Sequence, residues 1–243
     1  MVKRQNLRKA FIILTFLLFP LIFSYASPYL IIVGASLGII NASFIIFLIL
    51  FVLSLFFGRA WCGYVCPAGG LQECLMLAQP KKAKGGKLYL IKYFIWVPWL
   101  CTIAFFFIKA GGIKKIDFFL YIQNGISILG PIQLLIIYYA VVFVFTILSL
   151  IAGKRASCHY LCWMAPFMII GTNFARFLKI PTLHLKTDKT KCISCKKCSE
   201  RCPMSLDVKS MVESETMTNS ECILCGECID ICPKKVIAYS YKR

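Results

Sequence analysis

The segment from Ala10 to Gly58 contains no Asp, Glu, Lys or Arg in 49 residues. A helix that crosses a hydrocarbon core of about 30 Å needs roughly 20 apolar residues, so this run is too long for a single span. Two spans joined by a short turn fit it, and we place them at about 10–27 and 37–57, with the turn between Ser27 and Ser36. The sequence therefore predicts a membrane protein.

Two further apolar segments predict a third and a fourth span. The third runs from about residue 88 to residue 108, and the fourth from about 131 to 152. Phe118–Gly130 is then an interfacial or re-entrant segment on the far side of the membrane. We expect residues 1–180 to form an α-helical membrane domain of four transmembrane helices. A cleaved signal peptide is the alternative for the first span, but no small-residue cleavage motif precedes a soluble stretch.

The distribution of basic residues predicts the orientation of these spans. The formal net charge is +18, from 28 basic and 10 acidic residues, which at first suggests a nucleic-acid-binding protein. However, 17 basic residues lie before residue 186, and 14 of them fall on one side of the predicted membrane against three on the other. By the positive-inside rule, both termini are cytoplasmic. We therefore expect a multi-pass protein of a prokaryotic plasma membrane that contacts anionic lipid and binds no nucleic acid.

The C-terminal residues 181–243 contain a repeated cysteine motif. Four cysteines with the spacing CxxCxxCxxxCP begin at Cys192 and recur 30 residues later, beginning at Cys222. In this motif three thiolates hold one cubane, and the fourth binds the other cluster. We expect one [4Fe–4S] cluster at Cys192, Cys195, Cys198 and Cys232. We expect the second at Cys222, Cys225, Cys228 and Cys202.

This motif predicts a small α+β domain of the bacterial two-[4Fe–4S] ferredoxin type. Zinc also binds CxxC pairs, but a zinc site needs four ligands and has no use for the doubled motif. The connection Met204–Ser220 is polar and longer than a minimal ferredoxin would need. We expect two [4Fe–4S] clusters in this domain, and the length of that connection leaves its surface undefined.

Two CxxxC motifs follow the second and fourth predicted spans. The cysteine pairs are Cys62 with Cys66 and Cys158 with Cys162, and each pair comes after LSL, two apolar residues, Gly and a basic residue. This recurrence predicts that the membrane domain is two duplicated hairpins. Cysteines at i and i+4 share a helix face, so the four thiols together are a candidate third metal or cluster site. The alternatives are buried apolar cysteines or a redox-active dithiol.

Three other residues near these motifs have simpler interpretations. His159 lies inside the second motif, and we expect a hydrogen-bonding role rather than ligation. Cys101 falls within the third span, where packing is the simplest role. Cys74 follows Cys66 by eight residues and is a candidate spare ligand.

The stretch from Gly58 to Glu73, GRAWCGYVCPAGGLQE, resembles the signature of the membrane polyferredoxin family of the NapH/MauN type. The resemblance implies four or more helices, two CxxxCP motifs and a cytoplasmic ferredoxin module. It also implies electron transfer between the quinone pool, cytoplasmic donors and exported redox enzymes or their maturation. The second motif departs from the pattern, because Trp163, Met164 and Ala165 separate Cys162 from Pro166.

Several other functions lack their sequence signals. The two histidines, His159 and His184, lie outside the predicted spans, which excludes a bis-histidine haem in the membrane, and there is no CxxCH motif, nucleotide-binding motif or catalytic constellation. The first hypothesis is a membrane-bound iron–sulfur electron carrier that acts with quinone or other redox subunits as a component of an oxidoreductase. The second is a redox-sensing or metal-reducing maturation factor for an exported metalloenzyme. The third is a structural anchor whose clusters are dispensable.

Overall fold

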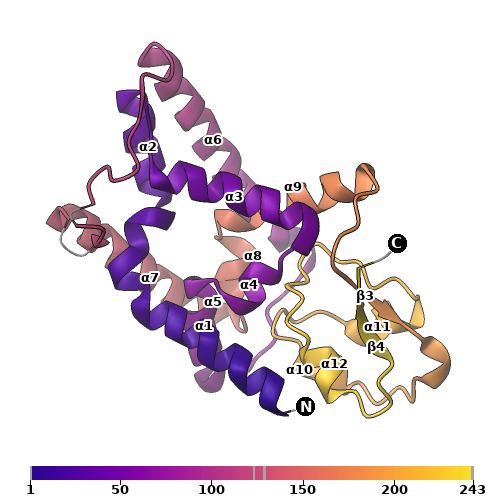
Figure 1. The fold of residues 1–243 in the computed structure, drawn as a ribbon. Helices are drawn as coiled ribbons and strands as arrows, with labels where there is room; N and C mark the ends of the chain where they lie inside the picture. Colours follow the sequence, from indigo (N-terminus) through magenta and orange to yellow (C-terminus); the bar gives the residue numbers. More distant parts are fainter. Residues whose placement is uncertain (1, 123, 128–129, 242–243) are drawn as a thin grey trace.

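The computed structural model describes residues 2–122, 124–127 and 130–241, which form a helical part and a small domain of mixed structure (Figure 1). Three helical segments are long and apolar enough to cross a membrane, namely Lys3–Leu37, Gly86–Lys109 and Ile132–Ala152. A fourth apolar helix, α3 (Ala42–Phe57), has 16 residues. A helical part with three candidate membrane helices is thus confirmed, whereas the count of four spans stays a prediction.

The first long segment is a broken helix. It consists of α1 (Val2–Ile22), the 3-10 helix η1 (Phe23–Ala26) and α2 (Pro28–Leu37). Our placement of a turn between Ser27 and Ser36 is wrong, because helix α2 occupies that stretch. Ser27 caps α2 by accepting from the backbone N–H of Leu30, and Pro28 has the fixed φ that suits a first helical turn. The chain turns instead at Gly38, whose φ is +71°.

The third and fourth predicted spans agree closely with two helices. The 3-10 helix η2 (Gly86–Leu90) leads into α6 (Ile91–Lys109), and the last long helix is α7 (Ile132–Ala152). On the far side, β1 (Ile39–Ile40) pairs in parallel with β2 (Lys115–Ile116). Within the predicted interfacial segment 118–130, residues 123, 128 and 129 lie outside the described residues.

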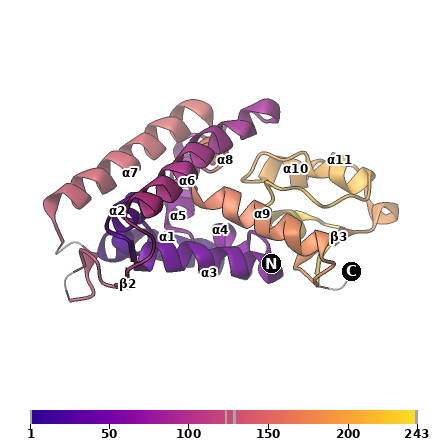
Figure 2. The same cartoon turned by 90° about the horizontal axis from the view of Figure 1, so that it is seen from above.

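Two helices that the sequence did not predict lie at each CxxxC motif. The first contains the first cysteine of the motif, namely α4 (Ala60–Tyr64) or α8 (Ala156–Tyr160), and the second begins after the last cysteine, namely α5 (Pro67–Ala78) or α9 (Met164–Phe177). Helix α5 packs against α1 and α7, while α9 packs against α3 and α6 (Figure 2). The helix after each motif therefore packs against the long helix that precedes the other motif: α5 packs against α7, and α9 packs against α3.

The C-terminal domain is of the ferredoxin type. Strand β3 (His184–Thr187) pairs antiparallel with β4 (Ile237–Ser240), and Leu185 lies opposite Tyr239. Its helical turns are η4 (Lys189–Lys191), α10 (Lys197–Arg201), α11 (Val208–Glu213) and α12 (Glu227–Ile231). Helix α11 lies in the polar connection 204–220, and its Val212 is 2% exposed. The long connection thus contributes to the core of the domain.

The small domain and the membrane part share one hydrophobic core. Cys62, Cys158 and Met168 pack in the same cluster of buried side chains as Ile223 and Cys225. The two parts approach closely at Gly63 in α4, where an added Cβ would lie 2.5 Å from the carbonyl oxygen of Ile223. The ferredoxin-type domain is therefore packed directly onto the first CxxxC motif.

Candidate iron–sulfur centres

The four cysteines predicted for the first cluster line one cavity at the outer end of the small domain. They are Cys192, Cys195, Cys198 and Cys232. The loop between them contains two residues with positive φ, Ser194 at +54° and Lys196 at +58°. These left-handed residues bend the chain around the cavity instead of letting it extend. Cys195 is exposed to solvent, so this cavity is open at one edge.

The four cysteines predicted for the second cluster line another cavity, next to the membrane part. They are Cys202, Cys222, Cys225 and Cys228. Burial raises the pKa of Cys202, Cys222 and Cys225 to about 11 in each case. Such thiols are protonated at neutral pH unless a bound metal supplies positive charge, because only the thiolate is a ligand.

Each cavity is lined by four cysteines, which is the donor set of a [4Fe–4S] cluster. Among the described residues, no three His, Cys, Asp or Glu side chains converge closely enough to hold one metal ion. A zinc ion would draw its sulfur ligands to about 2.3 Å, whereas a cubane fills a space between its cysteines. The residues present therefore fit a [4Fe–4S] cluster in each cavity, and the assignment of individual ligands stays a prediction.

The two CxxxC pairs lie together and are buried. Cys62, Cys66 and Cys158 are each 5% exposed and Cys162 is 8% exposed. Burial, and then the negative charge of the other three thiolates, raises the pKa of Cys66 well above its ordinary value, which reflects their mutual proximity. Gln72 donates a hydrogen bond to Cys158 Sγ at 2.9 Å. Tertiary packing thus brings together four thiols that are separated by nearly 100 residues in the sequence.

Two arginines at matching positions border this group of cysteines. Arg59 and Arg155 each lie three residues before the first cysteine of their motif, and they are 3% and 0% exposed. Arg59 Nε and Nη2 and Arg155 Nε have no hydrogen-bond partner among the described residues. Burial disfavours the charge on Arg59, but the thiolate of Cys62 and the carboxylate of Glu221 outweigh it and keep the pKa of Arg59 above its usual value.

Two buried glutamates neutralise these arginines from other elements. Glu73 in α5 accepts from Arg155 at 2.7 Å and from Arg8 of α1 at 3.0 Å. Burial opposes its ionisation, but Arg155 and Arg8 prevail and hold the pKa of Glu73 at about 2. Sequence reasoning missed this group, although Glu73 is one of only two acids before residue 186.

Glu221 of the ferredoxin-type domain neutralises the other arginine, Arg59, in the same way. It pairs with Arg59 at 3.1 Å and also with Lys92 Nζ of α6. His159 Nδ1 lies 3.5 Å from Glu221, and the His159 ring stacks on Tyr89. His159 therefore lies beside the carboxylate next to the second cysteine cavity, and its predicted hydrogen-bonding role stays a prediction, because neither ring nitrogen has a hydrogen-bond partner among the described residues. No signal in the sequence pointed to Glu221, whose partners come from three distant segments.

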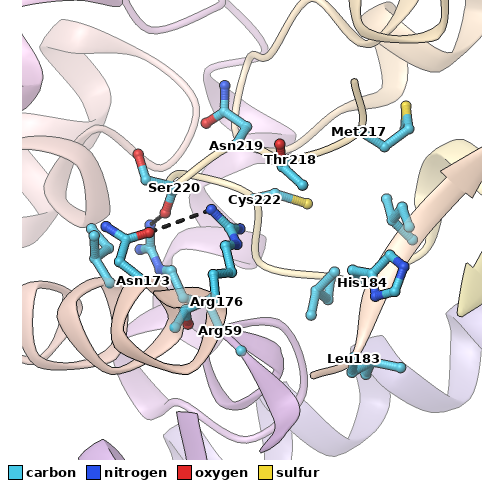
Figure 3. A pocket seen from close by; sticks show the side chains of 15 residues that line it. Arg59, Asn173, Arg176, Leu183, His184, Met217, Thr218, Asn219, Ser220 and Cys222 are labelled. Carbon is cyan, nitrogen blue, oxygen red and sulfur yellow. Dashed lines mark hydrogen bonds between the residues drawn. The ribbon is translucent and has the colours of Figure 1, made fainter. Parts of the chain in front are cut away.

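A pocket that several polar side chains help to line lies where the two parts of the chain meet (Figure 3). Arg59 Nη1 donates to the carbonyl oxygen of Ser220 at 2.8 Å, and Arg176 donates to Asn173 at 3.4 Å. In the close-up both arginines lie near Cys222, one of the predicted ligands of the second cluster. Positive charge thus surrounds the second cavity on the side of the membrane part.

An apolar cavity of about 320 Å³ adjoins the CxxxC pairs on their other side. Cys66 and Cys162 contribute to its wall, and the remainder is mostly apolar, with Phe23, Leu134 and Tyr138 among its lining residues. The cavity lies among α1, α2 and α7 within the membrane part. It can accept an apolar molecule that reaches it from the lipid phase.

The two other cysteines lie apart from these centres. Cys74 is partly buried in α5, and no structural observation makes it a ligand. Cys101 is exposed on α6. The prediction that Cys101 packs inside the protein is therefore wrong, because apolar side chains on a membrane helix also face outward toward lipid.

Comparison with known proteins agrees with this geometry. A family model described as a 4Fe-4S binding domain matches residues 42–84, which include Cys62 and Cys66, and a 4Fe-4S dicluster domain matches residues 184–233. The "Putative electron transport protein YccM" of Escherichia coli K12 is 24% identical over 76% of the chain and 53% of its own length. No solved structure matches the chain.

Two uncharacterized proteins of Methanocaldococcus jannaschii are also similar. One is 28% identical over 83% of this chain and 72% of its own length, and the other is 25% identical over 98% and 97%. The alignment with the second of these relatives therefore extends over both the membrane part and the ferredoxin-type domain of this chain.

Proposed function

We propose that this chain, a membrane-type polyferredoxin with an iron–sulfur electron-transfer function, carries electrons between its ferredoxin-type domain and a partner in the membrane. The eight cysteines that line the two cavities would hold two [4Fe–4S] clusters, which supply one-electron chemistry. The observation that carries the proposal is the contact of α4 with the loop of the second cavity. Gly63 abuts Ile223 and Cys225, so the two kinds of cysteine site share one core.

A third cluster at the CxxxC pairs is part of this proposal. The four thiols are buried together, and Arg59 and Arg155 supply two buried positive charges beside them. A [4Fe–4S] cube with four thiolates is an anion, so unpartnered guanidinium nitrogens are the groups that its sulfurs would need. The match of a 4Fe-4S binding domain to residues 42–84 supports the same assignment.

Iron content tests this assignment. We expect about twelve iron atoms per chain in anaerobically purified protein, from three [4Fe–4S] clusters. Replacement of Cys62, Cys66, Cys158 and Cys162 by serine should remove about four of them and leave the EPR signals of the other two clusters. A serine variant of Cys74 is the matched control. If the wild-type protein and the quadruple variant both contain about eight iron atoms, the third cluster does not exist.

The membrane partner that we propose is a quinol. The apolar cavity of about 320 Å³ touches Cys66 and Cys162, so a quinone ring there would lie beside the proposed third cluster. The basic residues predict that both termini lie in the cytoplasm of a prokaryotic cell. In that orientation the carrier would connect the quinone pool to cytoplasmic redox partners across the plasma-membrane interface.

Filling the cavity tests the quinol site. Leu134→Trp places a large ring at a residue that is 7% exposed and lines the cavity, so it should abolish reduction of the clusters by menaquinol. Reduction by dithionite and the iron content should stay unchanged. Ile136→Trp, on the same helix but 62% exposed, is the control. Normal reduction of Leu134→Trp by menaquinol would contradict a quinol site in this cavity.

A further inference from the structure

The first cysteine cavity has a solvent face of unusual composition. We name it the outer face and define it by Ile193, Cys195, Lys196, Lys197, Lys234 and Lys235. All six residues are exposed, and Ile193 has 57% of its surface in contact with solvent. By contrast, Cys202, Cys225 and Cys228 of the second cavity are buried, as are the four CxxxC cysteines. The outer face is therefore where a cluster edge meets solvent.

The lysines of the outer face are not neutralised within the protein. Nearby ion pairs engage other lysines, since Lys189 pairs with Glu215, Lys191 with Asp188 and Lys209 with Glu213. Lys196, Lys197, Lys234 and Lys235 form no ion pair among the residues that the structure describes. Three of the four, all except Lys235, line the cavity of the first cluster. Their positive charge thus surrounds an exposed thiol ligand.

We propose that the outer face is the docking surface for a small acidic soluble redox protein. This inference rests on the proposed electron-carrier function and names its soluble partner by chemistry. An exposed Ile193 amid lysines gives an apolar contact inside a basic ring, which suits a partner with an acidic ring around its own exposed redox centre. In a productive encounter the chain, reduced beforehand by quinol, loses one electron and the partner gains one, with no proton or covalent bond exchanged.

Anionic lipid is the other surface that lysines could contact, but the position of the face argues against it. Residues of the second cavity, not the first, pack against the membrane part, through Gly63 and Cys225. The exposed Cys195 also has no evident use at a lipid surface, whereas an open cluster edge shortens the distance for electron transfer to a docked protein. The observations therefore favour a protein partner.

The test uses the full chain in nanodiscs of zwitterionic lipid and an acidic bacterial two-[4Fe–4S] ferredoxin as the probe. The triple variant K196Q/K197Q/K234Q should bind the probe at least about tenfold more slowly at low salt, because steering by charge accelerates encounters by that factor or more. Its association rate should also depend less on ionic strength. The control variant K109Q/K114Q/K115Q removes the same charge from exposed residues around β2 and should match the wild-type protein.

Two further measurements distinguish a failure of the docking proposal from a failure of the electron-carrier function on which it rests. Reduced methyl viologen, a small cation, should reduce the clusters of the wild-type and triple variant chains alike. If it cannot reduce the wild-type chain, the electron-carrier function fails, whatever the outer face binds. If it can, and the triple variant binds the ferredoxin as fast as the control does, the docking proposal is wrong. It is also wrong if the triple variant loses only binding to phosphatidylglycerol vesicles.

Discussion

Buried charge is costly unless it is paired, and the centre of this protein contains a great deal of it. Arg155 and Arg59 lie beside the CxxxC thiols, and each is neutralised by a glutamate from another element, Glu73 or Glu221. On each arginine, at least one guanidinium nitrogen has no hydrogen-bond partner among the described residues. At the residue scale, the positive charges are therefore held in place by carboxylates while part of each guanidinium stays available to the cysteine site.

Replacement of Glu73 tests this arrangement. Glu73→Gln leaves Arg155 buried without its counter-charge and Arg8 with Glu227 alone, which should destabilise the protein by about 3 kcal/mol at pH 7. The loss should appear as a lower midpoint of thermal unfolding in detergent. Glu213→Gln is the control, because its ion pair with Lys209 is half exposed and should change the midpoint little. Equal midpoints for Glu73→Gln and wild type would contradict the role assigned to Glu73.

The stability difference between the wild-type protein and Glu73→Gln should depend on pH, and the pKa of Glu73 gives the direction of that dependence. The pKa of Glu73 is lowered from 4.5 to about 2 in the folded protein, so its ionised form stabilises the fold above pH 4.5. That stability is lost as the pH falls from 4.5 toward 2. The gap in stability between wild type and Glu73→Gln should thus be constant from about pH 7 down to pH 5 and should narrow at lower pH. A gap that widened on acidification would exclude this explanation.

At the scale of elements, the short helix α4 joins the membrane part to the ferredoxin-type domain. Helix α4 begins directly after Arg59, ends before Cys66 and turns its Gly63 toward the loop of the second cavity. A side chain at this position has no room, because the nearest atoms belong to backbone. Close contact between the two parts thus depends on a glycine within the first CxxxC motif.

Gly63→Ala should therefore weaken the contact between the two parts. The added Cβ would lie 2.5 Å from the Ile223 carbonyl oxygen, and overpacking of this kind costs about 1–3 kcal/mol. Hydrogen exchange in the 220–226 loop should rise, and reduction of the ferredoxin-type domain by menaquinol should slow. Gly85→Ala is the control, because its Cβ would meet only the movable hydroxyl end of Tyr89. Unchanged hydrogen exchange in the 220–226 loop would mean that the contact between the two parts does not depend on a glycine at position 63.

At the scale of the whole molecule, the basic residues have more roles than topology. The N-terminal residues Arg4, Arg8 and Lys9 pair with Asp230 and Glu227 of the ferredoxin-type domain. The first helix thus secures the last domain of the chain. Part of the net charge of +18 serves this docking, and part remains unpaired on the outer face.

Local pattern was sufficient for the long apolar helices and for the cysteine groups of the tail. The predicted spans at 88–108 and 131–152 agree with α6 and α7 within a few residues, because uncharged runs of that length have few other stable states. Likewise, the cysteines of each predicted cluster line a common cavity. Helix α2 was not predicted because Ser27 and Pro28 are typical of turns as well as of the first residues of a helix.

Tertiary structure alone decided what surrounds the cysteines. Glu221 meets Arg59 and Lys92 across more than 120 residues, and Arg8 meets Glu73 across 65. No periodicity encodes such pairs, since each depends on how helices and domain pack after they form. Spacing along the chain specifies ligands because a cluster is bound by residues close in sequence, whereas the charges that tune and support it come from whichever elements the fold brings alongside.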